Sequence, residues 1–297
     1  MDRRGFLLAA SALLAAGCAR VPPPAIAGAA GLTTPAVAAP LLIGTESAAP
    51  VALMAQLLVR AVAARGRAAG TEVFGEAWQA ALGAGESAAK PAYAGTLWAS
   101  LGGGGDAPAA ADLPGAVADL LSPEVSVVSA AGVDGSLMWV VTEATALTGI
   151  TTLDKIARWS RGKVAAVPEF AISRADGLPG LKAAYGAGFT VSKTESPRER
   201  AAALTTGRAA IAAFRRSEYS GTGLFELADT NKIELPDPAV ILVSSKLVDA
   251  EPDLVLAMEA LAAKLSTGQL LDFQAKLAGG ASADGILDAW LKAEGLA

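Results

Sequence analysis

The chain has 297 residues, of which 53% are hydrophobic and 18% are charged, and its net charge is -5. This length allows one large domain or two lobes, and an acidic balance without a Lys/Arg stripe argues against nucleic acid as a partner. Histidine is absent and cysteine occurs once, which excludes Ser-His-Asp and Cys-His catalysis, histidine and cysteine metal sites, and internal disulfides. We therefore expect no metal and no cofactor.

The N-terminus has the pattern of an export signal. Arg3 and Arg4 precede an apolar stretch that is too short to cross a bilayer, and Ala-Ala-Gly-Cys, ending at Cys18, resembles a bacterial lipobox. The two arginines also resemble a twin-arginine signal. The alternative is an uncleaved signal anchor with a cysteine there by chance. We predict a signal peptide over 1–17, lipidation of Cys18, and a disordered Pro/Ala-rich tether over 18–40. The folded part would then be exported and held at a membrane surface.

Beyond the tether, strand patterns alternate with helix patterns. In chain order, the residues predict a strand at 40–44, a helix at 49–65, a strand at 71–77, a helical turn at 78–82, a strand end and a helix within 87–101, a helix at 113–121, a strand at 136–145, a helix at 152–160, strands at 163–168 and 188–193, a helix at 198–206, strands at 209–214 and 238–245, and helices at 252–265, 268–277 and 283–294. This alternation predicts an α/β fold with mostly parallel sheets and flanking helices.

One stretch, EFAISRADGLPGLKAAYG at 169–186, places charged residues and glycines directly after a buried strand. Strand ends that face the start of a helix are where α/β proteins hold ligands. Arg174 is the candidate ligand contact, because a guanidinium offers two N–H groups to the two oxygens of a carboxylate. The simpler interpretation is a structural ion pair of Arg174 with Asp176 or with Glu169.

This stretch resembles the substrate-binding proteins of osmoprotectant ABC importers, the glycine betaine/choline/carnitine group. The family pattern is Glu-Phe, then Arg-x-Asp-Gly-Leu-x-Gly-Leu, then Tyr-Gly, and this chain has one extra residue after Glu-Phe. Pro-Ala-Tyr93-Ala-Gly-Thr96 resembles the family's Pro-Glu-Tyr-Thr-Gly-Thr, and the first strand and the closing residues are similar too. The resemblance is spread over about residues 41–297.

The resemblance implies a two-lobed periplasmic-binding-protein-like fold of type II, in which hinged lobes close on a ligand. The chain would cross between the lobes twice, near Gly132 and at 236–239. Lobe one would then be 41–132 plus 242–297, and lobe two would be 133–241. Arg174 matches the family arginine that pairs with the ligand carboxylate.

The ligand cage departs from the family pattern. Family members hold quaternary ammonium ions between tyrosine faces, and this chain has three tyrosines in all. Tyr93 matches one cage position; Leu137 stands at a second, where Trp139 on the same strand face is placed to replace the ring. Phe214 or Arg215 stands at a third position and Asp237 at a fourth, while Glu46 replaces the first-strand lysine. The expected ligand-binding residues are Tyr93, Thr96, Trp139, Glu169, Arg174, Phe214, Arg215 and Asp237.

Three interpretations of the function follow. The leading class is an exported lipoprotein receptor that binds a small solute between its lobes and delivers it to an ABC permease. In the first interpretation, the solute is a quaternary ammonium compound, held in a cage rebuilt from Tyr93, Trp139 and Phe214. In the second, the solute is a different and more polar osmolyte. The alternative is an accessory or structural lipoprotein of the same fold with an altered or collapsed cleft and no osmoprotectant binding. We expect a monomer held at the membrane through Cys18.

An enzyme on this fold would need Asp, Glu or Lys as its base. Glu169, Asp176 and Asp237 are the cleft candidates, and the sequence pairs none of them with a second catalytic group. We therefore expect no enzymatic activity.

Overall fold

The computed structural model describes residues 39–103, 107–218 and 221–297. Residues 39–297 form one unit by their internal contacts. The predicted signal peptide, Cys18 and nearly all of the predicted tether lie outside the described residues.

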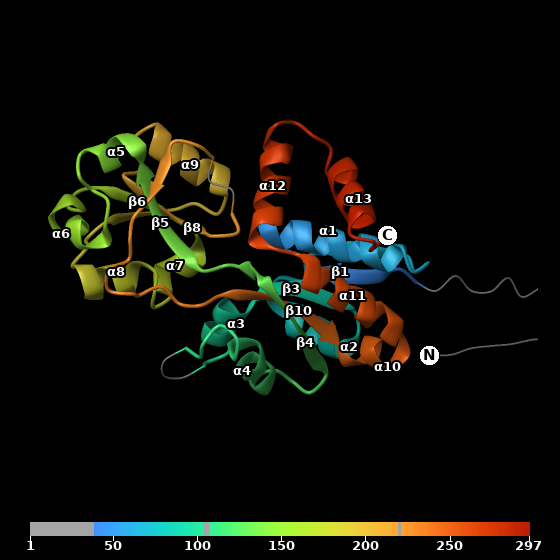
Figure 1. The fold of residues 1–297 in the computed structure, drawn as a ribbon. Coiled ribbons are helices and arrows are strands. Elements are labelled where there is room, and N and C mark those ends of the chain that lie inside the picture. Colours follow the sequence, from blue (N-terminus) through green and yellow to red (C-terminus); the bar gives the residue numbers. More distant parts are fainter. Residues whose placement is uncertain (1–38, 104–106, 219–220) are drawn as a thin grey trace, which may run out of the picture. The chain divides into compact units, whose positions relative to one another are not determined.

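The first sheet contains strands from both ends of the described chain (Figure 1). Its order is β2 (Ala69–Glu72), β1 (Leu41–Gly44), β3 (Ala89–Tyr93), β10 (Pro238–Ser244) and β4 (Val125–Asp134). β1 pairs in parallel with β2 and β3, whereas β10 runs antiparallel between β3 and β4. The insertion of β10 joins a late segment of the chain to an early one.

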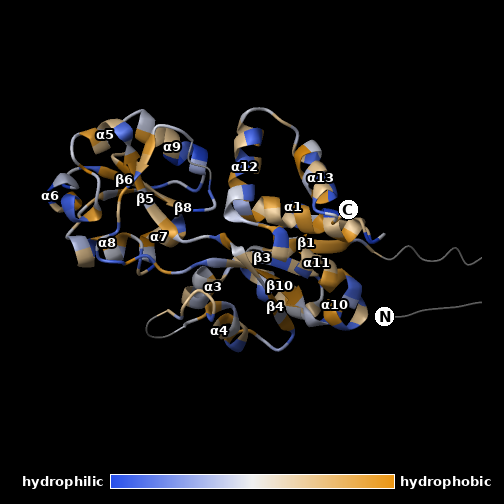
Figure 2. Ribbon diagram, in the orientation of Figure 1, coloured by the Kyte–Doolittle hydropathy of each residue, from blue (hydrophilic) through white to orange (hydrophobic). Residues whose placement is uncertain are grey.

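Helices cover both faces of this sheet, because alternate residues of a strand point to opposite faces. Ala239, Ile241 and Val243 of β10 pack with one group of helices, and Val240 and Leu242 pack with the other. The first group is α1 (Ala49–Ala63), α10 (Ser245–Ala250), α11 (Pro252–Lys264), α12 (Thr267–Ala278) and α13 (Ala283–Ala293), and the second is α2 (Trp78–Ala84), α3 (Ala94–Ser100) and α4 (Leu113–Leu120). Figure 2 shows the apolar residues of these elements.

The second sheet has the order β7 (Thr190–Lys193), β6 (Val164–Val167), β8 (Ile211–Arg215), β5 (Leu137–Thr142) and β9 (Leu224–Glu226). One core cluster joins it to α5 (Glu143–Leu147), α6 (Ile156–Trp159), α7 (Glu169–Ser173) and α8 (Leu178–Tyr185). A second cluster joins its other face to α9 (Pro197–Thr205). Ser196 caps α9 by accepting a hydrogen bond from the Glu199 N–H, which satisfies a backbone donor that the first helical turn leaves free.

We call the first sheet with its helices lobe one, and the second sheet with its helices lobe two. The chain passes from β4 to β5 between Asp134 and Leu137, and it returns from β9 to β10 between Glu226 and Pro238. The boundaries expected from the sequence, at 132–133 and 241–242, therefore fall inside β4 and β10. Both strands belong to lobe one over their whole length.

The predicted α/β fold class with two sheets and flanking helices is confirmed, but the expectation of mostly parallel sheets is wrong. In each sheet two pairings are parallel and two are antiparallel. The antiparallel pairs involve β10 and β5, the strands next to the two passages between lobes. β2 covers 69–72 instead of 71–77, and Gly75–Ala77 forms a short 3-10 helix.

Among the residues that the structure describes, no single helix is long and apolar enough to cross a membrane. One pair, α11 with α12, has the required length and composition together, with a bend of 86° between its two helices.

Candidate functional site

Five ends of secondary structure bring polar side chains together where the two lobes meet. Tyr93 ends β3, Thr96 lies in the first turn of α3, and Arg215 ends β8. Arg174 follows α7, and Asp237 directly precedes β10. We call this group of residues the interlobe cluster. The strands deliver its members from distant parts of the sequence, as expected for the ligand edge of an α/β fold.

Asp237 is the centre of the interlobe cluster and is 1% exposed. Its Oδ1 accepts a hydrogen bond from the Thr96 backbone N–H at 2.9 Å, and its Oδ2 accepts one from the Thr96 hydroxyl at 2.9 Å. Tyr93, at the N-cap position of α3, makes no side-chain cap. Asp237 therefore caps α3 from a distant segment, placing a carboxylate where the first turn has free N–H groups.

Arg174 binds two carboxylates. Its Nε and Nη2 donate to the two oxygens of Asp176 at 2.6 and 2.7 Å, and its Nη1 donates to Asp237 Oδ2 at 2.6 Å. Burial alone would lower the pKa of Arg174, but the Asp237 and Asp176 carboxylates raise it above its ordinary value. The structural Arg174–Asp176 ion pair therefore forms, while Glu169 takes no part in it.

Arg215 lies between two aromatic rings. Its guanidinium carbon is 4.3 Å from the centroid of Tyr93 and 4.0 Å from that of Phe170. Its Nη1 donates to Asp237 Oδ2 at 2.5 Å and to the Gly135 carbonyl at 3.1 Å, and its Nη2 donates to the Thr96 hydroxyl at 3.0 Å. The side chain is thus held by ring faces, a carboxylate and neutral acceptors at once, which are the contacts that a bound cation would make.

Tyr93 connects the ring pair to the second lobe. Its hydroxyl lies 2.6 Å from the Ser217 hydroxyl, and burial raises the pKa of Tyr93 well above its ordinary value, so this hydroxyl stays protonated. The close approach of Gly135 requires glycine, because a Cβ there would lie 2.2 Å from the Tyr93 ring. Gln274 of α12 donates to the Ser217 carbonyl at 2.7 Å, which adds a further contact between the lobes.

Together with Asp176, the interlobe cluster is electrically balanced, because the two guanidinium groups of Arg174 and Arg215 pair with the carboxylates of Asp176 and Asp237. All four side chains are buried. Buried charges persist only when they are paired and hydrogen-bonded, and the contacts above meet that condition. The same contacts fill the space between Tyr93, Phe170 and Asp237.

Five of the eight expected ligand-binding residues lie in this cluster: Tyr93, Thr96, Arg174, Arg215 and Asp237. The other three lie elsewhere. Trp139 belongs to the core of lobe two, Phe214 is fully buried beneath the Arg200 guanidinium, and Glu169 is exposed and pairs with Lys193. The rebuilt cage of Tyr93, Trp139 and Phe214 is therefore not assembled in this structure.

Phe170, which supplies the second ring, was not among the expected ligand-binding residues. The signal was present, because Phe170 stands in the Glu-Phe pair of the motif on α7, four residues before Arg174. Glu46, at the position of the family's first-strand lysine, pairs with Lys90 of β3 at 2.5 Å. A lysine and an acid are thus both present there, with the lysine on the neighbouring strand.

No protein-family model and no curated protein matches the chain. Solved structures share its fold. A glycine betaine/carnitine/choline ABC transporter protein is 19% identical over 86% of this chain and 99% of its own, with a TM-score of 0.67. Apo YehZ from Escherichia coli is 18% identical over 88% and 100%, with a TM-score of 0.63. An ABC-transporter choline-binding protein in complex with choline is 14% identical over 85% and 87%, with a TM-score of 0.63. The predicted resemblance is therefore confirmed at the level of the fold.

Proposed function

We propose that this chain is an exported, non-enzymatic receptor of an ABC import system that binds a small polar solute between its lobes. The observation that carries the proposal is the convergence of Tyr93, Phe170, Arg174 and Thr96 at the junction of the two lobes. Ring faces recognise the cationic end of a solute, and the Arg174 guanidinium suits its anionic end once the solute carboxylate has replaced one of the two carboxylates that Arg174 now binds. The fold shared with solute-binding transport proteins supports the same conclusion.

The cation site favours a hydrogen-bond donor over a quaternary ammonium ion. The position between the two rings holds the Arg215 guanidinium, which donates to Asp237, Thr96 and the Gly135 carbonyl. A trimethylammonium group has no N–H and would leave the Gly135 carbonyl without the donor that Arg215 supplies, which costs roughly 1–3 kcal/mol. Asp237 and the Thr96 hydroxyl would keep Arg174 as a donor. A guanidino or amino solute that displaces the Arg215 side chain would donate to the Gly135 carbonyl in its place.

A thermal-shift titration tests this receptor function and its specificity. We expect guanidinoacetate, arginine or agmatine to raise the melting temperature, whereas betaine, choline and carnitine do not. A ligand at about a hundred times its dissociation constant adds about 2.7 kcal/mol to stability, which is readily measured. Arg174→Ala should abolish the shift given by the carboxylate-bearing compounds, and Asp272→Ala on the exposed face of α12 should leave it unchanged. A shift with betaine alone would contradict the proposed specificity.

The burial of Arg215 and Asp237 favours a second candidate function, that of an accessory lipoprotein whose cleft is closed by its own side chains. Such a protein would bind no solute and would act through contacts with other components of the import system. The two functions differ in one result. If Arg215→Ala leaves every solute in the panel without effect, the receptor function is excluded and the accessory function is retained.

The anchor proposal rests on the lipobox-like sequence that ends at Cys18, with the ABC permease as the proposed partner at the membrane. Cys18→Ser removes the thiol that would carry the lipid. We expect the wild-type protein, expressed in a bacterial host with lipoprotein processing, to partition into the detergent phase of a Triton X-114 extraction. The serine variant should move to the aqueous phase. Equal partitioning of both proteins would contradict lipidation.

A further inference from the structure

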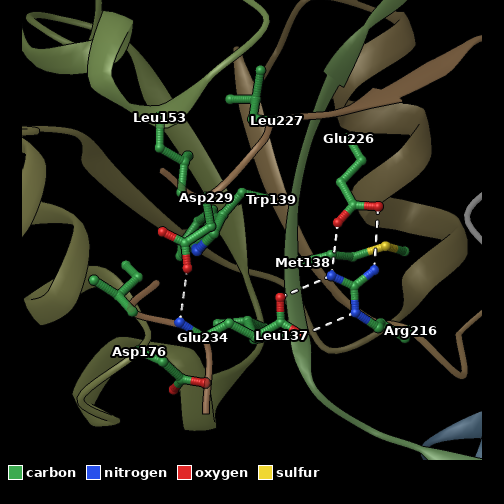
Figure 3. A pocket seen from close by; sticks show the side chains of 11 residues that line it. Leu137, Met138, Trp139, Leu153, Asp176, Arg216, Glu226, Leu227, Asp229 and Glu234 are labelled. Carbon is green, nitrogen blue, oxygen red and sulfur yellow. Dashed lines mark hydrogen bonds and ion pairs between the residues drawn. The ribbon is translucent and has the colours of Figure 1, made fainter. Parts of the chain in front are cut away.

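Lobe two contains a cavity of about 170 Å³ that is separate from the rings of Tyr93 and Phe170. It lies between β5, the end of β9 and the segment that returns toward β10 (Figure 3). Leu137, Leu153 and Ile233 give it apolar walls, and Trp139 also lines it. A water molecule takes up roughly 30 Å³ in the liquid, so the cavity has room for a small organic molecule.

The indole N–H of Trp139 is the first sign that the cavity receives a ligand. Trp139 is 3% exposed, and its Nε1 makes no hydrogen bond to any described residue. In Figure 3 this nitrogen lies on the side of the cavity that holds Asp229. A buried N–H without an acceptor costs roughly 1–3 kcal/mol, so a ligand atom that accepts its hydrogen bond would be stabilised there.

The charge of the lining is the second sign. Arg216 donates to both Glu226 and Glu234, which raises the pKa of Arg216 above its ordinary value and keeps it charged. The single positive charge of Arg216 is thus paired with two negative charges. Asp229 accepts from the Tyr185 hydroxyl and the Glu234 backbone N–H, both of which are uncharged donors.

The lining therefore carries more negative than positive charge. Asp176 also lines the cavity, but Arg174 neutralises it from the interlobe cluster. The remaining groups are three carboxylates and one guanidinium. Among the described residues, no group of three or more acidic side chains has the arrangement that would hold a metal ion. The excess charge therefore favours an organic cation.

We propose that this cavity binds a small organic cation that also carries a hydrogen-bond acceptor, such as an amino alcohol. Its ammonium group lies against Asp229 and the acids around Arg216, and its oxygen accepts from the Trp139 N–H. The ligand needs both its positive charge and its acceptor oxygen, because the carboxylates recognise only the charge and the indole N–H recognises only the oxygen. The site lies within lobe two and does not depend on a solute between the lobes.

Three probes of similar size separate the two requirements. Ethanolamine carries both the cation and the oxygen, ethylamine carries only the cation, and ethylene glycol carries only oxygens. Isothermal titration of the purified protein should give an affinity for ethanolamine at least tenfold higher than for either of the others. Equal binding of all three probes, or no binding of ethanolamine at about 10 mM, would overturn the proposal. The tenfold ratio and this concentration are on the order expected for one or two polar contacts.

Two conservative variants assign the contacts. Trp139→Phe keeps an aromatic ring without the N–H, so ethanolamine should bind no better than ethylamine. Asp229→Asn keeps the shape without the charge, so ethanolamine should lose most of its advantage over ethylene glycol. Asp272→Ala, in an exposed pair with Lys276 on α12, should leave all three affinities unchanged. Affinities for ethanolamine that neither Trp139→Phe nor Asp229→Asn alters would mean that ethanolamine binds without these two groups. This result would overturn the proposed site and leave the interlobe proposal intact.

Discussion

Asp237→Ala is expected to lower the free energy of unfolding by roughly 3–5 kcal/mol, the usual cost of removing one partner from a buried ion pair. Asp237 accepts hydrogen bonds from Arg174, Arg215 and Thr96 and is almost completely buried. Its loss leaves the Arg215 guanidinium in the interior without a carboxylate and removes the cap of α3. Urea denaturation, monitored by tryptophan fluorescence, measures the change.

Two control variants separate the charge from the volume. Asp237→Asn keeps the size and an acceptor oxygen for the cap, so it should retain most of the destabilisation through the lost charge alone. Asp272→Ala breaks an exposed pair with Lys276 on α12 and should cost at most about 0.5 kcal/mol. A loss below about 1 kcal/mol in Asp237→Ala would mean that the interlobe cluster is open to water, contrary to the burial of Asp237.

Arg215→Ala is expected to create a cation site between the Tyr93 and Phe170 rings. The protein should lose about 3 kcal/mol of stability, because a buried guanidinium with several acceptors is removed while Arg174 still neutralises Asp237. Added methylguanidinium should fill the vacated position and restore part of this loss. At ten times its dissociation constant it should return about 1.4 kcal/mol, measured as a rise in melting temperature.

The comparison with tetramethylammonium decides which cations the rings accept. This ion satisfies the aromatic faces but donates no hydrogen bond, so it should restore much less stability than methylguanidinium. Arg60→Ala, which removes a guanidinium paired with Asp284 and Asp288 near the surface, should show no rescue by either ion. Equal rescue of Arg215→Ala by both ions would mean that the rings alone select the cation, and would restore quaternary ammonium solutes as candidates.

Much of the fold was predictable because the helix and strand patterns are local. The helix at 49–65 and the buried strand at 238–245 have strong patterns, and the structure places α1 and β10 there. Short elements without a pattern of their own, such as β9 and α5, were not predicted. β9 forms because residues 224–226 pair with β5, a partner more than eighty residues earlier in the chain.

The site was predicted in part. The motif spacing placed Arg174 beside Asp176, since two residues separated by one position are close in any compact turn. It also marked Tyr93, Thr96, Arg215 and Asp237 as candidates. It could not show that these residues contact one another, because that requires the ends of β3, β8 and the segment before β10 to meet.

The sequence by itself determined an alternating α/β chain, a lipobox-like N-terminus, the absence of histidine chemistry, and the residue types available to a binding site. These properties follow from composition and from local periodicity. The tertiary structure alone decided which ring faces which charge. Arg215 occupies the place between Tyr93 and Phe170, whereas Trp139 lies in lobe two beside another cavity. The physical reason is strand register: residue 139 of β5 lies opposite Ala213, two positions away from Arg215, and the pairing of distant strands fixes that offset.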